Sequence, residues 1–299
     1  MAVQEGGLKW KAKIWNTWTR RNMEDCGKND GLRADERRDI LEERLEADAC
    51  IESTSEEDAR TAEEEEEYYL ACERRWVFLM LMLVAGFYGV FTFLLRGGVF
   101  CNAQTGNFVF LAIAIGTFQW KQAVYYLLPM SAYLLGTMVS EIIPRPVKRT
   151  HIIRWDTLLV LIEMIAVIIL GWLPETAPHQ ISQITINFIC AMQYNTFRQA
   201  QGIPMATTFC TNHVRQIGLT IVKKLRKKSG GDVDIKMWTH IRMLLFFVIG
   251  GAASAVLCGI FKGKAIWFTL IPLTIVFTGL LYADRVTEHD KIEETPRGH

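Results

Sequence analysis

The stretch Arg96-Gly-Gly-Val-Phe-Cys-Asn-Ala-Gln-Thr-Gly-Asn107 interrupts a long run of apolar segments. A second stretch, Gln201-Gly-Ile-Pro-Met-Ala-Thr-Thr-Phe-Cys-Thr-Asn-His213, interrupts the same run further along the chain. Each stretch follows an apolar segment of membrane-spanning length and opens a short second one. Small and hydroxyl-bearing residues at membrane depth, occurring twice, predict an internal repeat with polar backbone inside the bilayer. Membrane transporters build substrate sites in this way.

The composition divides the chain of 299 residues into unlike parts. Hydrophobic residues make up 50% of the whole and the mean hydropathy is +0.14. Residues 1–75 are nevertheless strongly charged and mostly acidic, whereas residues 76–283 are apolar. About 20 apolar residues suffice to cross a bilayer, so we expect a transmembrane domain over residues 76–283 and a cytoplasmic tail over residues 284–299. The net charge of +1 averages an acidic segment with basic loops and indicates no nucleic-acid partner.

The N-terminal segment, residues 1–75, has two features of its own. Trp10, Ile14 and Trp18 recur at a spacing of four among basic residues, which favours a short interfacial helix over residues 8–21. Residues 52–67 carry almost nothing to bury, so we expect this acidic run to be disordered or a solvated helix, or else a docking segment for a basic partner. Residues 1–22 lack the apolar core that a secretory signal peptide needs.

The apolar region predicts an all-α membrane protein with six transmembrane helices and two short re-entrant or half-length helices. The expected transmembrane helices cover residues 76–95, 123–143, 155–173, 181–197, 238–260 and 265–282, and the short segments cover residues 103–118 and 206–222. The order is span, short segment, span, span, occurring twice. Thr105 and Thr211 lie 106 positions apart, and the same offset carries the first and third spans close to the fourth and sixth.

Basic residues predict the orientation, because cytoplasmic loops collect Lys and Arg. The strongest clusters, in residues 145–154 and 223–228, both fall on the cytoplasmic side if the short segments re-enter and return to the side they left. Each repeat unit then has three crossings, so the second copy is inverted. Two short segments that cross fully would instead give parallel repeats. We expect a multi-pass protein of the inner (cell) membrane with both termini in the cytoplasm.

Polar residues at the two breaks are the first candidates for a site. Glycines or proline permit each break, at residues 97, 98, 202 and 204. The candidate substrate-binding residues are Asn102, Gln104, Thr105 and Asn107 in the first copy and Thr207, Thr208 and Thr211 in the second. A helix start exposes N–H groups and favours an anion or a carboxylate. Alternatively, these side chains cap short helices and hold the two halves together.

Glu163 is the sharpest single candidate, because it lies in the middle of a span among apolar neighbours. A carboxylate there must face the bundle and be partnered or protonated, and such residues usually couple protons or bind cations. The alternative is a structural pairing with Gln193 or Asn195. Asn195, which lies on nearly the same helical face as Asn187, is also a candidate for lining a cavity.

Other charged residues are expected near water. Arg96 and Arg198 lie near span ends and are expected to snorkel to the interface. Glu141, Arg154 and Asp156 also lie near a predicted interface, so a topological role is expected for them.

No metal, cofactor or enzyme signature is present. His213 and His240 have no second ligand at useful spacing, and the seven cysteines are scattered without a metal or disulfide pattern. The sequence contains no Gly-x-Ser-x-Gly, no His-Glu-x-x-His and no Walker loop. We therefore expect neither enzyme activity nor ATP-driven pumping.

The stretch Arg96–Asn107 with its apolar continuation to Gly116, together with Asn195–Thr211, resembles the YoaK family of bacterial multi-pass membrane proteins. The likeness covers roughly residues 76–283. That family is a domain of unknown function, so the resemblance implies a membrane location and a fold but no substrate. Asn212-His213 stands where a Gly-Asn pair like Gly106-Asn107 would be expected, which departs from a strict equivalence of the two breaks.

These observations together predict a secondary transporter or channel for a small solute, embedded in the lipid bilayer. The alternative is a non-transporting membrane scaffold or sensor that binds a partner through the acidic segment. Substrate, coupling ion, direction and oligomeric state do not follow from the sequence.

Overall fold

The computed structural model describes residues 69–144, 147, 153–226, 231–292 and 294–296. The predicted interfacial helix at residues 8–21 and the acidic run at residues 52–67, with the partner that the run would bind, lie outside the described residues.

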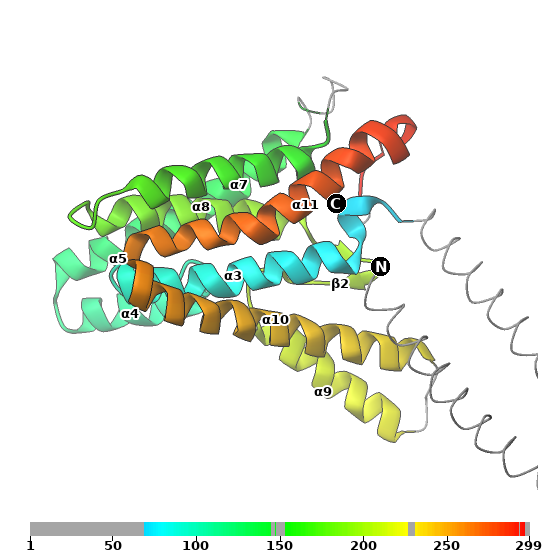
Figure 1. Ribbon diagram of the computed structural model, residues 1–299. Helices are drawn as coiled ribbons and strands as arrows, with labels where there is room; N and C mark the ends of the chain where they lie inside the picture. Colours follow the sequence, from blue (N-terminus) through cyan, green and yellow to red (C-terminus); the bar gives the residue numbers. More distant parts are fainter. Residues whose placement is uncertain (1–68, 145–146, 148–152, 227–230, 293, 297–299) are drawn as a thin grey trace, which may run out of the picture. The chain divides into compact units, whose positions relative to one another are not determined.

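The described chain is almost entirely helical, with one two-stranded turn. Its elements are η1 (Ala71–Glu73), α3 (Arg75–Leu95), α4 (Gln104–Gly116), α5 (Trp120–Ile142), α7 (Trp155–Trp172), α8 (His179–Thr196), β1 (Gln199–Ala200), β2 (Ile203–Pro204), α9 (Thr211–Leu225), α10 (Gly231–Phe261), η2 (Lys262–Thr269), α11 (Leu270–Tyr282), η3 (Ala283–Thr287) and η4 (His289–Lys291). Figure 1 shows the long helices lying side by side, with α3 between α10 and α11.

Close helix pairs are made by glycines that let two backbones approach. In α3 and α10, a Cβ added at Gly86 would lie 2.0 Å from the Phe247 carbonyl oxygen, and one added at Gly250 would lie 1.9 Å from that of Leu83. The α5–α8 pair has the same device at Gly136, where a Cβ would lie 2.3 Å from a carbonyl oxygen. Small residues at such crossings are characteristic of membrane helices, whose association depends on close packing.

The first break turns the chain back into the bundle. Gly97 and Gly98 adopt positive φ, which glycine allows without strain. Asn102 Nδ2 then donates to the Ala85 carbonyl, halfway along α3. The chain returns through α4, and Tyr125, near the start of α5, donates from its hydroxyl to the Gly97 carbonyl. The segment from residue 97 to residue 125 therefore enters and leaves at the same end of the bundle.

The second break lies at the opposite end. Strands β1 and β2 form a tight antiparallel turn, in which Gln201 and Gly202 both have positive φ. Gln201 N–H donates to the Glu73 carbonyl, just before α3 starts. Helix α9 then runs antiparallel to α10, and Lys224 pairs with Asp234 at 2.8 Å where the two helices are joined.

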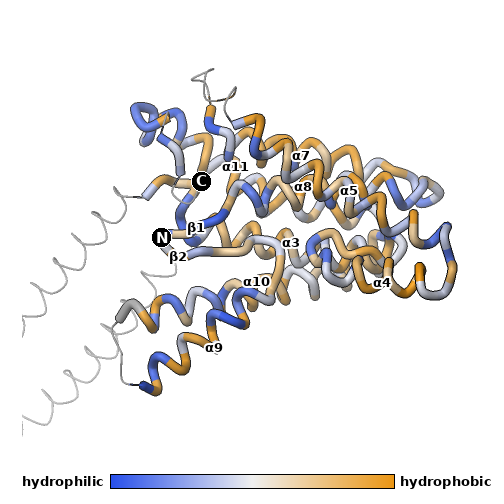
Figure 2. The backbone as a smooth tube through the Cα atoms, turned by 180° about the vertical axis from the view of Figure 1, so that it is seen from behind, coloured by the Kyte–Doolittle hydropathy of each residue, from blue (hydrophilic) through white to orange (hydrophobic). Residues whose placement is uncertain are grey.

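Among the described residues, four helical stretches are long and apolar enough to cross a membrane: Arg75–Leu95, Trp120–Ile142, Trp155–Trp172 and Val233–Thr287. The last has 55 residues and contains α10, η2 and α11. Large apolar side chains are exposed along α4, α5, α7 and α10, as expected for lipid contact. In Figure 2 hydrophobic colour runs along the helices, and the hydrophilic colour gathers toward the ends of the bundle and on α9.

The sequence predicted the order of these helices but missed some of their bounds. Helix α10 begins at Gly231, seven residues before the predicted start at Trp238. The helix extends beyond its apolar part because its polar first turns pack against α9. The predicted sixth span is divided between the 3-10 segment η2 and the 13-residue α11. Helix α8 has 18 residues but is too polar to be a candidate span by its hydropathy. Its polar residues Gln183, Asn187 and Gln193 are buried inside the bundle.

Candidate functional site

Glu163 lies in the middle of α7 and is completely buried. The hydroxyl of Tyr88, on α3, is close enough to the Glu163 carboxyl to interact with it, and Thr269 at the end of η2 is also beside Tyr88. Within the part of the chain that the structure describes, neither Glu163 oxygen nor Tyr88 Oη has a hydrogen-bond partner. A carboxyl group is thus held at the centre of the bundle beside the Tyr88 hydroxyl, without a formed hydrogen bond among the described residues.

Hydroxyl and thiol groups from both breaks meet the same region. Thr207 and Thr208, in the second break, are fully buried, and the Thr208 hydroxyl lies beside that of Tyr133 on α5. Cys101, in the first break, faces Cys190 on α8. Cys190 also lies close enough to Glu163 for an electrostatic interaction between the two groups. We call Tyr88, Cys101, Tyr133, Glu163, Cys190, Thr207 and Thr208 the central cluster.

Several buried polar atoms of the bundle lack a hydrogen-bond partner among the described residues. Among the described residues, the hydroxyls of Thr207 and Thr208 accept and donate no hydrogen bond, and neither do the two amide atoms of Gln193 on α8. Each such group, buried and unsatisfied, costs about 1–3 kcal/mol. Native proteins satisfy nearly all buried polar groups, so these exceptions, like those at Arg96 and Gln183 elsewhere in the bundle, require an explanation such as a bound solute, ion or water. The central cluster offers one ionisable carboxyl together with neutral donors and acceptors.

Three of the sequence candidates hold the first break in place. Asn102 binds the Ala85 carbonyl, and Gln104 Nε2 donates to Asn187 Oδ1 at 2.8 Å, which joins the break to the middle of α8. Asn107 is fully buried; its Nδ2 donates to the Phe100 carbonyl at 2.7 Å and its Oδ1 accepts from the Phe100 N–H at 3.0 Å. These side chains are satisfied, in keeping with the structural alternative stated for them.

Other candidates lie away from the central cluster. Thr105 and Thr211 are exposed, each in the first turn of its short helix. Asn195 donates to Ser140 at 2.8 Å near the ends of α5 and α8, and its Oδ1 accepts from Arg198 at 2.6 Å. Of the nine candidates, Glu163, Thr207 and Thr208 are fully buried without a hydrogen-bond partner among the described residues, and Thr208 is connected toward Glu163 through Tyr133 and Cys190.

Two histidines that are 27 residues apart in sequence meet between α9 and α10. His213 Nδ1 lies 2.9 Å from His240 Nδ1, and His213 Nε2 lies 2.8 Å from the Ala206 carbonyl oxygen. Both rings are buried. The sequence treated them as isolated, because only the antiparallel packing of the two helices brings them together.

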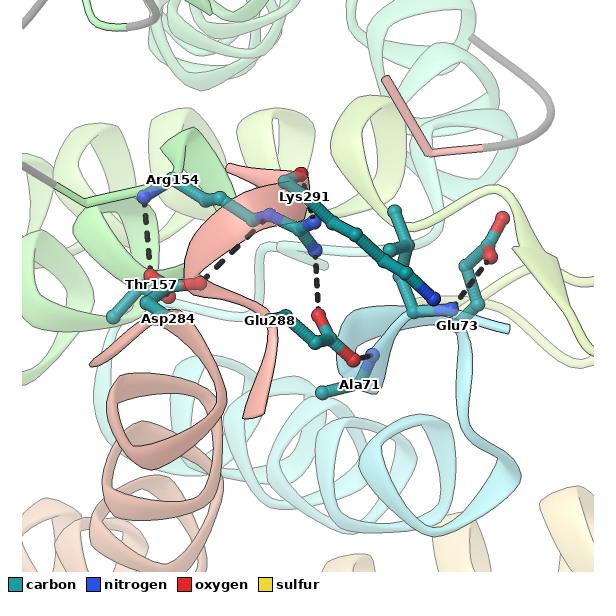
Figure 3. A network of polar contacts seen from close by, with 8 residues as sticks. Ala71, Glu73, Arg154, Thr157, Asp284, Glu288 and Lys291 are labelled. Carbon is teal, nitrogen blue, oxygen red and sulfur yellow. Dashed lines mark hydrogen bonds and ion pairs between the residues drawn. The ribbon is translucent and has the colours of Figure 1, made fainter. Parts of the chain in front are cut away.

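A buried polar network closes the end of the bundle where α3 starts (Figure 3). Arg154 Nη1 donates to Glu288 at 2.9 Å, and the Arg154 N–H donates to Asp284 at 3.1 Å. The other Glu288 oxygen accepts from the Ala71 N–H at 2.7 Å, and Thr157 donates to Asp284 at 2.6 Å. The residues that follow α11 are thereby fixed to η1 and to the start of α7.

The expectation that these end residues reach water was wrong for Arg154 and Asp156, which are 6% and 4% exposed. The turns that follow α11 cover them. Arg96, expected to snorkel, is 1% exposed and lies over the Phe91 ring, because Gly263 leaves room for its guanidinium beside Glu175. Arg198 behaves more nearly as expected and pairs with Glu141 at 3.0 Å near the surface.

Apolar helices with large exposed hydrophobic side chains and polar groups gathered inside define an all-helical membrane protein. The chain matches the family described as "Protein of unknown function (DUF1275)" over residues 77–279, and it belongs to this family. The expected likeness to the YoaK family agrees with this assignment at the level of DUF1275. Neither a curated protein nor a solved structure matches the chain.

Proposed function

We propose that the protein is a secondary transporter or channel for a small polar solute, and that the central cluster is its binding site. One observation carries this proposal: the Glu163 carboxyl is fully buried in the middle of α7 and makes no hydrogen bond within the described residues. A carboxylate inside a membrane bundle is expensive and usually marks a substrate or ion pathway. The unsatisfied hydroxyls of Thr207 and Thr208 supply the groups that would bind the rest of the solute.

The proposal includes six crossings and two re-entrant helices. The crossings are α3, α5, α7, α8, α10 and the η2–α11 pair; α4 and α9 enter from opposite ends and return. Lys223, Lys224 and Arg226 at the end of α9 assign the end with Arg154 to the cytoplasm by the positive-inside rule. This orientation places both chain ends on the cytoplasmic side of the cell membrane. Within DUF1275, we group the chain with the YoaK family on the two break motifs.

Matching contacts support an internal repeat. Asn107 binds the Phe100 carbonyl in the first break, and His213 binds the Ala206 carbonyl in the second. The residue numbers differ by 106 in both cases, and each bond joins residues seven positions apart, the second of which lies in the first turn of a short helix. The close crossings match as well: Gly136 of α5 approaches the carbonyl of Phe188 on α8, and Gly250 of α10 approaches that of Leu83 on α3.

A third pair of contacts supports an inverted repeat. Glu175, just after α7, accepts a hydrogen bond from the Gly263 N–H at the start of η2, at 2.8 Å. Asp284, just after α11, accepts one from the Arg154 N–H at the start of α7, at 3.1 Å. The residue numbers differ by 109 in both cases. Because the two contacts lie at opposite ends of the bundle, the halves are related by an axis in the membrane plane, the arrangement of many transporters.

The first test is Glu163→Gln in proteoliposomes, with flux measured for a panel of sugars, amino acids and monovalent cations. At least one solute should be transported by the unchanged protein, and Glu163→Gln should reduce that flux at least tenfold. Glu294→Gln, which changes an exposed residue of the C-terminal region, is the matched control and should leave flux unchanged.

Thermal unfolding separates a functional role of Glu163 from a structural one. Glu163→Gln removes a buried ionisable group without changing its size, so the variant should unfold at the same or a higher temperature. Undiminished flux in a well-folded Glu163→Gln protein would refute the assignment of the site. We propose no enzymatic activity, in keeping with the missing motifs.

A further inference from the structure

The bonds of His213 fix how protons are arranged in the histidine pair. A carbonyl oxygen only accepts, so His213 Nε2 must carry the proton that is shared with Ala206. In the neutral ring the Nδ1 atom of His213 is then an acceptor, and the neighbouring Nδ1 of His240 must donate to it. His240 Nε2 is left without a proton. The neutral pair has this one arrangement, and its basic atom is His240 Nε2.

The first half of the protein shows that the loop before a short helix closes without a titratable group. Asn107 makes the equivalent bond to Phe100 with an amide, and that amide gains and loses no proton in the physiological range. An asparagine at position 213 would suffice for the same structural task. The second half has a histidine there instead, with a second histidine in contact. Unlike the Asn107 amide, the histidine pair can bind a proton.

The surroundings of the pair contain no charge that would hold a proton permanently. Helix α10 packs against α3, α9 and η2, and α9 packs against α10. Among the described residues of these elements, no charged or titratable group besides the partner ring acts on either imidazole; the Ala206 carbonyl is the remaining influence. Burial disfavours a charged ring, so we expect the pair to be neutral until the medium is acidified.

We propose that His213 and His240 form a binding site for a single proton, separate from the central cluster. The proton binds to the lone pair of His240 Nε2 and makes that ring an imidazolium, which keeps its Nδ1–H bond to His213. Transfer of the shared proton to His213 Nδ1 would move the charge one ring closer to Ala206. A second proton would place two N–H groups against each other and break the pair.

The location of the pair links this proton to the solute site. His213 holds the carbonyl of Ala206, the residue directly before Thr207 and Thr208 of the central cluster. A charge on the pair therefore acts on the backbone that positions those two hydroxyls. This link rests on the proposed function, whereas proton binding itself does not.

The test is 15N NMR of histidine-labelled full-length protein in lipid bilayers, titrated from about pH 8 to about pH 4. The chain has six histidines, and His213→Asn and His240→Asn assign the two signals. At the upper pH, His213 should be the Nε2–H tautomer and His240 the Nδ1–H tautomer. On acidification the pair should take up one proton, at a lower pH than a solvated histidine does.

Three results would overturn the proposal: the Nε2–H tautomer for His240, titration of the two rings as independent single histidines, or two neutral rings down to acid unfolding. His213→Asn should fold, because an asparagine closes the matching loop in the other half, and it should release His240 to the common Nε2–H tautomer. If this variant fails to fold, the spectra of the unchanged protein still decide the question. Proton binding by the pair together with undiminished flux in Glu163→Gln would refute the proposed solute site alone.

Discussion

The packing of α3 against α10 makes a quantitative prediction for Gly250→Ala. The new Cβ would lie 1.9 Å from the Leu83 carbonyl oxygen, a backbone atom that cannot rotate away. Moving this contact from 1.9 Å to the 3.4 Å of ordinary van der Waals contact requires the two helix backbones to separate by roughly 1.5 Å. Overpacking of a tight interior typically costs 1–3 kcal/mol, and a backbone clash belongs at the upper end, at about 3 kcal/mol.

Gly259, in the same helix, is the matched control. A Cβ there has nothing within 4 Å, so Gly259→Ala should be neutral or stabilise the protein by up to about 1 kcal/mol through helix propensity. Unfolding of both variants in detergent can be followed by tryptophan fluorescence, since the chain has nine tryptophans. Equal stability of the two variants would refute the close α3–α10 crossing and, with it, one of the contacts that support the repeat.

Two further predictions concern the network at the Arg154 end. Glu288→Ala removes an ion-pair partner of the buried Arg154 and the acceptor of the Ala71 N–H, so it should destabilise the protein by about 3–5 kcal/mol in detergent unfolding. The control Asp290→Ala changes an exposed residue and should alter stability by less than about 0.5 kcal/mol. Equal effects of the two substitutions would contradict the network. Burial, and secondarily the charge of Asp156, raises the pKa of the Cys72 thiol well above its usual value, so little reactive thiolate forms. A protein whose sole cysteine is Cys72 should therefore react slowly with maleimide at about pH 8 and faster as the pH rises. Glu288→Ala should increase the reaction rate, because it removes the hydrogen bond that holds η1 in place. A rate like that of a free peptide thiol in the protein with Glu288 intact would contradict the packing around Cys72.

The order of the helices and the positions of both breaks could be predicted from sequence, because hydropathy and glycine act locally. Trp76 to Leu95 is apolar throughout and forms α3 almost as expected. Gly97, Gly98 and Gly202 all adopt the positive φ that the breaks need. Glu163 could be found as well, since a carboxylate within an apolar run stands out before any fold is known.

The predictions from sequence that failed concern the exposure and contacts of single residues, which depend on which face of a helix packs against which neighbour. Thr105 and Asn107 are two residues apart, yet one is exposed and the other is fully buried. Tyr88 looks like an ordinary aromatic residue in sequence and joins the central cluster only because the fold brings it close to Glu163 on α7. Arg154 was expected near water because its partners, Asp284 and Glu288, lie more than a hundred residues further along the chain.

Within the proposed repeat, agreement and disagreement between the halves carry different information. Contacts that occur in both halves, such as those of Glu175 and Asp284 with the starts of opposite helices, hold the scaffold together and need no further explanation. The offset of 109 that relates the contacts of α7 and α11 pairs Glu163 with Pro272, and the offset of 106 that relates the two breaks pairs Asn107 with His213. At each of these pairs only one half has a titratable group. A scaffold that needed these groups for folding would need them twice, so their single occurrence points to binding of a solute or a proton.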